Sequence, residues 1–215
     1  MHKAFDFVRE VLRGKTIYRI LFNWEVQKHC RNLSGEVLDL ASGGLASYYR
    51  YLPKNTKLIR TDYRPGKDID LVVDLNRPLP LPDNQYQNIL LFNAINILVN
   101  TTDVFKEINR ILTVGGKLFL SSLFIANEMP EPHDFNRLTY EGIMKQLTAA
   151  GFSRVEIYRI GERATAATHI MAPFYPFSFI RLFIYPMAIL LDRLISKSVR
   201  TKYPCPIGYF VIAQK

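Results

Sequence analysis

The chain has 215 residues, of which 48% are hydrophobic, and its 28 Lys and Arg against 19 Asp and Glu give a formal charge of +9. This length suffices for one domain with its own core, and two isolated cysteines, Cys30 and Cys205, exclude a disulfide framework and a zinc motif. An amino-terminal segment with charged residues every few positions lacks the apolar run of a signal peptide, so we expect a cytoplasmic protein.

The positive charge lies at the two ends of the chain. Residues 1–34 carry seven Lys and Arg against three acids, and residues 163–215 carry seven against one, which leaves residues 35–162 close to neutral. One interpretation is that the ends meet an acidic partner or an anionic surface. The other is that the charges solvate exposed helices.

In chain order, residues 1–34 predict one or two amphipathic helices, with Phe5, Val8 and Leu12 at helical spacing. Short apolar runs bounded by turn residues predict strands. These runs are residues 36–40, 57–61, 69–73, 87–92, 117–124, 154–160 and 207–213. Further helices are predicted at residues 46–52, at 102–112 with Thr102 as the cap, and at 140–150, and Gly115-Gly116 is interpreted as a helix stop.

Strands that alternate with helices predict an α/β fold with a mainly parallel sheet covered on both faces. We expect one domain over residues 1–215. It divides into an amino-terminal helical cap (1–34), a core (35–161), an apolar and basic insertion or lid (162–206) and a final strand (207–215).

Ligands of such folds bind beyond the carboxyl ends of the strands. The small residues of the turn 41–44 would let a nucleoside approach the backbone, and Asp62, about 20 residues later, could accept hydrogen bonds from the ribose hydroxyls. Asp74 and Leu75, after the next strand, could contact the adenine. For the turn and for Asp74 the structural alternatives are an ordinary strand-to-helix turn and a turn-initiating acid.

Several motifs in this order resemble the class I S-adenosylmethionine-dependent methyltransferases. They are the run Val37-Leu38-Asp39-Leu40-Ala41-Ser42-Gly43-Gly44, then Asp62, Asp74, Leu79-Pro80-Leu81-Pro82-Asp83, and residues 104–116. The chain resembles the type 11 branch of this family most, because residues 134–139 and 150–152 are similar to segments common in that branch. Ala41 and Leu45 depart from this family, which usually has glycine at both positions, and Asn96-Ile97 replace its usual acid-histidine pair.

The resemblance implies a Rossmann-like seven-stranded sheet with an antiparallel last strand, and S-adenosylmethionine as the cofactor. By position, Asp62 would bind the ribose, with Tyr63 beside it, and Asn93 would lie beside the reactive methyl. Asp74 and Leu75 would contact the adenine. The residues implied to face the methionine part are Asp39, Ala41, Ser42, Gly43 and Gly44.

Methyl transfer needs alignment, exclusion of water and, for a hydroxyl acceptor, a general base. His133, in the loop after the fifth strand, is the candidate base, and a hydrogen-bonding role within the loop is the alternative. Glu128, Arg137 and Tyr140 are weaker candidates, and Arg137 could equally hold the loop.

Residues 164–191 are apolar and aromatic with one formal charge, Arg181, and the basic residues Arg193, Lys197, Arg200 and Lys202 follow. A lid over an apolar substrate pocket is the favoured interpretation and contact with a membrane surface is the second. A membrane span is the third, and Pro173, Pro176, Pro186 and Arg181 argue against it because prolines break helices.

The sequence therefore predicts a methyltransferase that acts on a small-molecule or lipid- or glycan-linked acceptor, with possible peripheral membrane contact through residues 164–202. Two alternatives remain, an RNA methyltransferase and a non-catalytic partner protein with the cofactor fold. Basic flanks permit the first, but the chain shows no recognised RNA-binding module.

Overall fold

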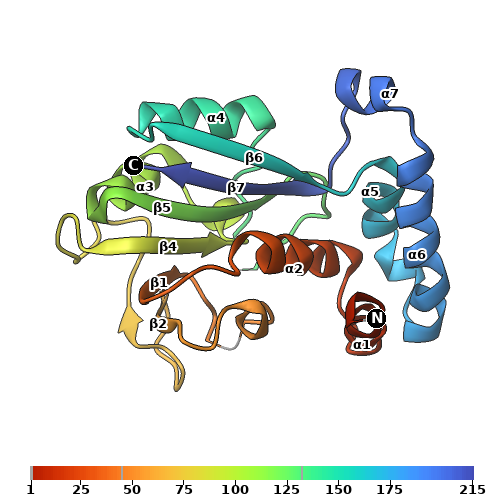
Figure 1. Ribbon diagram of the computed structural model, residues 1–215, viewed down its shortest axis with the longest axis horizontal. Coiled ribbons are helices and arrows are strands. Elements are labelled where there is room, and N and C mark those ends of the chain that lie inside the picture. Colours follow the sequence, from red (N-terminus) through yellow and green to blue (C-terminus); the bar gives the residue numbers. More distant parts are fainter. Residues whose placement is uncertain (1, 45, 132) are drawn as a thin grey trace.

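A computed structural model describes residues 2–44, 46–131 and 133–215, which form one seven-stranded sheet with helices on both faces (Figure 1). The strands are β1 (Glu36–Leu40), β2 (Lys57–Asp62), β3 (Leu71–Val72), β4 (Tyr86–Phe92), β5 (Leu112–Leu123), β6 (Arg154–Ile160) and β7 (Gly208–Gln214). Their order in the sheet is β3-β2-β1-β4-β5-β7-β6. Neighbours from β3 to β5 are parallel, and β7 is antiparallel to both β5 and β6. The predicted fold class is confirmed.

The helices are α1 (His2–Leu12), α2 (Ile17–His29), α3 (Thr101–Ile111), α4 (Tyr140–Ala149), α5 (Arg163–Ile170), α6 (Ser178–Leu194) and α7 (Lys197–Lys202). Helices α3 and α4 lie on one face of the sheet and pack on one hydrophobic cluster. Helices α1, α2, α5 and α6 lie on the other face and pack on a second cluster. The strands other than β3 supply side chains to both clusters, because successive side chains of a strand point to opposite faces. In β1, for example, Val37 belongs to one cluster and Leu38 to the other.

Three predicted boundaries are wrong. Residues 46–52 form no α-helix but only a short 3-10 turn at Tyr49–Tyr51. Asn100, not Thr102, caps α3, because its side chain accepts a hydrogen bond from the backbone N–H of Asp103. Gly115 and Gly116 do not end a helix, since β5 already begins at Leu112 and runs through both glycines.

The insertion folds into three helices at the carboxyl-end edge of the sheet, and α6 stands beside α5 and α1 (Figure 1). The expectation that the prolines break a helix is wrong for Pro186, which lies inside α6. Proline there removes one backbone hydrogen bond, but the packing of α6 on the second cluster continues on both sides of it, at Tyr185 and Ala188. Among the described residues, no helix combines the length and apolar character needed to cross a membrane.

Candidate functional site

A cavity of about 670 Å³ lies at the carboxyl ends of β1, β2, β3 and β4. The chain proceeds from β1 to β2 and β3 on one side and returns to β4 on the other, so the order of the sheet reverses here. Such a reversal is the usual ligand site of open α/β sheets. Of the predicted site residues, the cavity is lined by Ala41, Asp62, Tyr63, Asp74, Leu75, Asn93 and His133.

The turn after β1 adopts left-handed backbone conformations, with φ of 53° at Ala41, 63° at Gly43 and 82° at Gly44. The backbone N–H of Gly43 donates to Oδ2 of Asp62 over 2.9 Å, which ties this turn to the end of β2. A Cβ added to Gly43 would meet no atom within 4 Å, so the space next to this glycine is open. Of the two family departures, Ala41 lines the cavity without filling it, and Leu45 lies outside the described residues.

The carboxylate of Asp62 is half-buried at the cavity wall. Its Oδ2 accepts from Gly43, and its Oδ1 accepts from the backbone N–H of Arg64 over 3.1 Å. Each carboxylate oxygen has a second acceptor position. Asp62 can therefore hold the turn and still accept hydrogen bonds from two hydroxyls of a ligand.

Asp39 lies elsewhere than the resemblance implies. Its side chain is fully buried beneath the turn and lines neither cavity of the cleft, and both of its oxygens lie within hydrogen-bonding distance of the Tyr48 hydroxyl, at 2.9 and 2.8 Å. Burial raises the pKa of Asp39 to about 7, and the hydrogen bond from Tyr48 acts in the opposite direction. The arrangement gives Asp39 a role beneath the turn, in holding Tyr48, and no contact with the cavities.

A second cavity, of about 270 Å³, adjoins the first, because Ala41 and Asn93 line both. Ser42 lines it too, and two cations face it from the amino-terminal cap: Lys15 precedes the cap residue Thr16 of α2, and Arg19 lies in the first turn of that helix. Sequence reasoning missed Lys15 and Arg19, since they lie outside the core motifs. Their position at the break between two predicted amphipathic helices is the one signal that marks them.

Asn93 lines both cavities of the cleft. It follows β4 with a left-handed backbone (φ 57°), and its N–H donates to Oγ of Ser121 over 2.9 Å. The hydroxyl of Tyr18 in α2 donates to Oδ1 of Asn93 over 2.6 Å, and burial raises the pKa of Tyr18 to about 12, which keeps it a neutral donor. Among the described residues, Nδ2 of Asn93 has no hydrogen-bond partner although it is buried. The amide nitrogens of Asn23 and Asn109 also lack a partner, but only Asn93 lines both cavities, where a ligand could accept from it.

The loop after β5 closes one side of the first cavity through His133 and Glu131. The His133 side chain is exposed, and its ring stacks on Phe135 with centroids 5.1 Å apart. Arg137 holds the loop, since its Nη2 donates to Oδ2 of Asp134 over 2.6 Å. The other weaker candidates, Glu128 and Tyr140, do not line either cavity.

The insertion does not cover this cleft. None of the described residues between 162 and 206 lines either cavity. It does contact residues beside the cleft: the ring of His169 in α5 lies 5.9 Å from that of Tyr18, and Arg181 in α6 donates to the carbonyl of Gly14 over 3.2 Å. Among the described residues, no group of three or more His, Cys, Asp or Glu side chains is placed to hold a metal ion.

Comparison with known proteins agrees with this geometry. Residues 38–120 match the family model described as a methyltransferase domain, and they span β1 to β5 with the whole turn, Asp62, Asp74 and Asn93. Residues 38–120 are a methyltransferase domain. The match confirms both the resemblance and the predicted enzyme class, and it leaves the methyl acceptor open. No curated protein matches the chain.

Solved structures share the fold of this methyltransferase domain over nearly the whole chain. An S-adenosylmethionine-dependent methyltransferase from Archaeoglobus fulgidus is 17% identical, with 98% of this chain and 99% of that chain covered and a TM-score of 0.61. Phosphoethanolamine N-methyltransferase 2 from Haemonchus contortus, in complex with S-adenosyl-L-methionine, is 14% identical, with 90% and 52% covered and a TM-score of 0.57. An S-adenosylmethionine-dependent methyltransferase from Mesorhizobium loti is 15% identical, with 90% and 97% covered and a TM-score of 0.55.

Proposed function

We propose that this protein transfers a methyl group from S-adenosylmethionine to a small-molecule or lipid- or glycan-linked acceptor. The observation that carries the proposal is the cleft itself, in which Asp62 and the unpartnered amide of Asn93 face one continuous space at the reversal of the sheet. The family match over residues 38–120 supports the same activity.

The residues present fit the cofactor. The larger cavity lies within the range of about 300–1,000 Å³ typical of ligand sites, and it offers Asp62 to the ribose hydroxyls and Leu75 as an apolar surface for the adenine. The smaller cavity offers Lys15 and Arg19 to the carboxylate of the amino-acid end. Ala41 and Asn93, which line both cavities, would lie next to the sulfur.

S-adenosylmethionine supplies a methyl group on a positively charged sulfur, which is already activated toward attack. The protein's part is to align the acceptor with that methyl and to keep water out. The side-chain oxygen of Asn93 is held by Tyr18 and Ser121, and its Nδ2 is free to donate hydrogen bonds in the cleft. If the acceptor is a hydroxyl, His133 would take the proton that the hydroxyl oxygen loses as it gains the methyl group.

Neither alternative function gains a specific observation. A partner protein without cofactor would need a cleft that Ala41 closes, whereas Ala41 lines an open one. The cluster of exposed cations Arg193, Lys197, Arg200 and Lys202 belongs to α6 and α7 and lines neither cavity, so it gives an RNA substrate no specific support.

Calorimetric titration with S-adenosylmethionine tests the proposal. We expect saturable binding to the wild-type protein and a loss of affinity of about tenfold or more in Asp62→Ala, because the hydrogen bonds of a carboxylate are worth about 1.5–3 kcal/mol each. The control is Asp83→Ala, which removes an exposed aspartate just before the start of β4, whereas the cleft lies at the carboxyl end of that strand. Equal affinity of the wild type and Asp62→Ala would refute the ribose assignment, and no binding to any form would refute the function.

A further inference from the structure

Helix α6 has two opposite faces. Tyr185, Ala188 and Asp192, spaced three and four residues apart, are buried against the rest of the protein. A second set, also three or four residues apart, points to solvent, with Phe183 at 77% and Leu194 at 73% exposed. This set consists of Phe179, Phe183, Met187, Leu190 and Leu194, which we call the apolar stripe.

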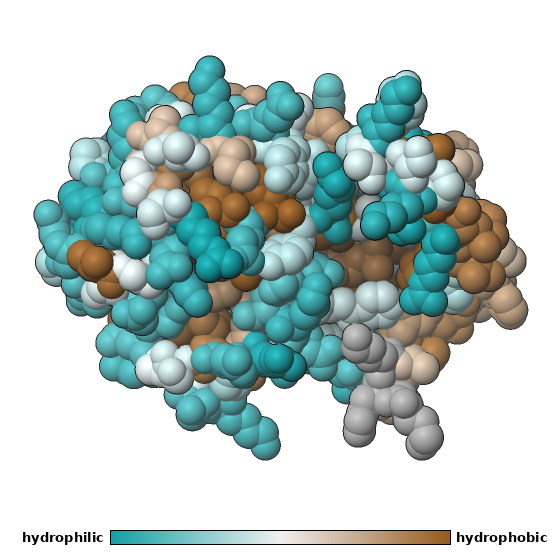
Figure 2. All heavy atoms as spheres, turned by 45° about the horizontal axis from the view of Figure 1, so that its top comes forward, coloured by the Kyte–Doolittle hydropathy of each residue, from teal (hydrophilic) through white to brown (hydrophobic). Residues whose placement is uncertain are grey.

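The apolar stripe continues into its neighbours. Phe174 and Phe177, in the segment that leads into α6, are exposed, and Phe177 stacks on Phe179. Helix α1 packs against α6 and exposes Phe5, Val8 and Leu12 at the same end of the molecule. Figure 2 shows apolar side chains gathered at this end, with hydrophilic ones beside them. Contiguous exposed apolar surface of this kind marks an interaction site.

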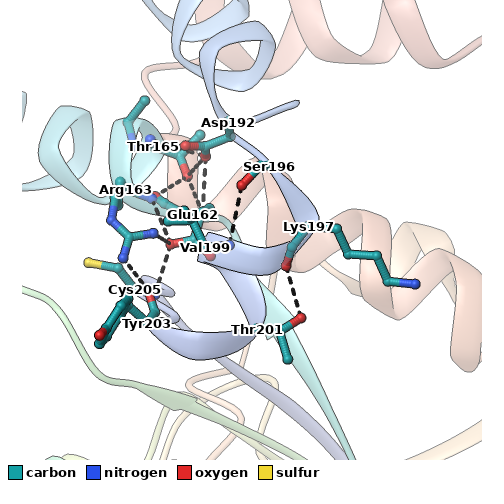
Figure 3. A network of polar contacts seen from close by, with 11 residues as sticks. Glu162, Arg163, Thr165, Asp192, Ser196, Lys197, Val199, Thr201, Tyr203 and Cys205 are labelled. Atoms are coloured by element: carbon teal, nitrogen blue, oxygen red, sulfur yellow. Dashed lines mark hydrogen bonds and ion pairs between the residues drawn. The ribbon is translucent and has the colours of Figure 1, made fainter. Parts of the chain in front are cut away.

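Within the segment that carries the stripe, residues 163–215, the exposed charge has one sign. Residues 163–215 contain a single acid, Asp192, against seven Lys and Arg. Asp192 is buried, and its carboxylate accepts hydrogen bonds from the backbone N–H groups of Glu162, Ala164 and Thr165 at 3.0, 2.7 and 3.2 Å (Figure 3). The surface of this segment therefore offers positive charge without a neighbouring surface acid of its own.

Part of this charge is collected in a cavity of about 530 Å³ between β6, α6 and α7. Its cations are Arg159, Arg193, Lys197 and Arg200, and within the described chain none of them forms an ion pair. The acids that line it are already used: Asp192 binds the backbone, and Oε1 of Glu162 accepts from Arg163 and from the N–H of Cys205 over 3.1 and 2.8 Å (Figure 3). A phosphate group suits the positive charge of this cavity and fits within its volume.

We propose that α6 and α7 form a docking surface for a lipid bilayer that contains anionic phospholipid. The apolar stripe enters the interface between headgroups and acyl chains, and the cations at the carboxyl end of α6 and in α7 contact the phosphates. A second copy of the chain fits less well. A symmetric pair would bring the same face together, and with it the basic residues of both copies, with no surface acid in this segment to balance them.

Co-sedimentation with vesicles tests the proposal in the absence of S-adenosylmethionine, so its outcome is independent of methyl transfer. We expect the wild-type protein to bind vesicles of equimolar phosphatidylcholine and phosphatidylglycerol, and to bind pure phosphatidylcholine at least tenfold more weakly. Raised salt should weaken binding to the anionic vesicles.

Two double variants separate the two contributions. Phe179→Ser with Phe183→Ser should weaken binding about 100-fold, because each exposed ring loses its burial in the interface. Lys197→Gln with Arg200→Gln should weaken binding about 30-fold, since each cation near an anionic surface strengthens binding about fivefold. Matched controls are Val114→Ser, an exposed apolar residue at the start of β5, and Lys54→Gln with Lys67→Gln. Both controls should bind as the wild type does.

Several results would overturn the proposal: no binding to anionic vesicles, equal binding to both vesicle types, or two double variants that bind as the wild type does. Light scattering on the same proteins adds another. A wild-type dimer that becomes a monomer in the phenylalanine variant, without vesicle binding by either, assigns the stripe to a second copy. Inorganic phosphate that binds through Lys197 and Arg200 while vesicles do not bind assigns the cavity to a free anion. If the phenylalanine variant does not fold, the proposal is tested by the Lys197→Gln with Arg200→Gln variant, and wild-type binding of that variant would overturn it.

Discussion

The hydroxyl of Tyr18, in the amino-terminal cap, donates a 2.6 Å hydrogen bond to Oδ1 of Asn93, at the end of β4. The two residues are 75 positions apart in the chain, and Tyr18 is buried against Phe22 and the sheet. Since the amide of Asn93 has one oxygen and one nitrogen, a donor that holds the oxygen also aims the nitrogen. The amino-terminal helices thus help to shape the cofactor cleft as well as to cover one face of the sheet.

We expect Tyr18→Phe to lower the affinity for S-adenosylmethionine by about fivefold to tenfold, because Asn93 loses the contact that orients it and a lost hydrogen bond costs about 1 kcal/mol. The free energy of unfolding should fall by a similar amount. Calorimetry and urea denaturation measure the two effects. Tyr86→Phe, a buried tyrosine at the opposite end of β4, is the control and should leave cofactor affinity unchanged. Unaltered affinity in Tyr18→Phe would show that Asn93 does not need this contact.

Arg19→Gln should weaken S-adenosylmethionine binding about tenfold, since a charge-assisted hydrogen bond to the cofactor carboxylate is worth about 1.5–3 kcal/mol. Methylthioadenosine, which has the nucleoside but no amino-acid end, should bind the variant and the wild type equally well. Comparing the two ligands by calorimetry isolates the second cavity from the first. Arg31→Gln, an exposed residue just beyond α2, serves as the control. Equal losses for both ligands would place Arg19 elsewhere than at the carboxylate.

Asp39→Asn should make the protein more stable at neutral and alkaline pH. Burial raises the pKa of Asp39 from its usual 3.8 to about 7 in the folded state. The wild-type protein therefore has its full stability below about pH 4, where Asp39 is protonated in both states, and loses stability as the pH rises toward 7. The loss amounts to at most about 4 kcal/mol. Asparagine carries no charge to bury and can still accept from Tyr48.

The measurement is the free energy of unfolding of both proteins between pH 4 and pH 8. The advantage of Asp39→Asn should be small at pH 4, grow up to about pH 7 and then remain constant. An advantage that does not change with pH would mean that Asp39 keeps its ordinary pKa in the folded protein.

Ala41→Gly should stabilise the protein by up to about 1 kcal/mol. Alanine at φ 53° occupies the left-handed region, which costs roughly 1–2 kcal/mol for a residue with a Cβ, and the greater chain entropy of glycine offsets part of the gain. Thermal unfolding measures the change, and cofactor affinity should be equal or higher, because Ala41 lines both cavities. Ala46→Gly, which lines only the smaller cavity, is the comparison. A less stable Ala41→Gly protein would contradict the assignment of strain to this turn.

The sheet could be predicted because each strand is a short apolar run and the runs alternate with helical segments. Its strand-end residues could be predicted for the same reason, since Asp62, Asp74 and Asn93 directly follow such runs. The segment after the first turn could not, because the apolar and aromatic residues of 46–52 suit a helix locally but pack into the second cluster as a 3-10 turn. Gly115-Gly116 misled for a related reason: β5 pairs with β4 at Leu112 and again from Lys117 onward, so the strand continues across an irregularity that contains both glycines.

The residues that reach the cleft from outside the core needed the structure. Tyr18 and Arg19 lie on α2, and only tertiary packing brings them beside Asn93 and Ser42. Asp39 shows the converse. It belongs to the motif in sequence, yet the alternation of side chains along β1 turns it beneath the turn toward Tyr48. The sequence motif predicts where the cleft lies, but the direction of each side chain determines which residues of the motif face it.

The hydrogen bonds of Asp192 to the backbone of residues 162, 164 and 165 fasten α6 to the chain that leaves β6. These bonds fix the position of the end of α6 relative to the end of β6. A surface on which this helix rested would set the height and the tilt of the cleft above it, so that geometric reach would select among acceptor molecules before any specific contact did.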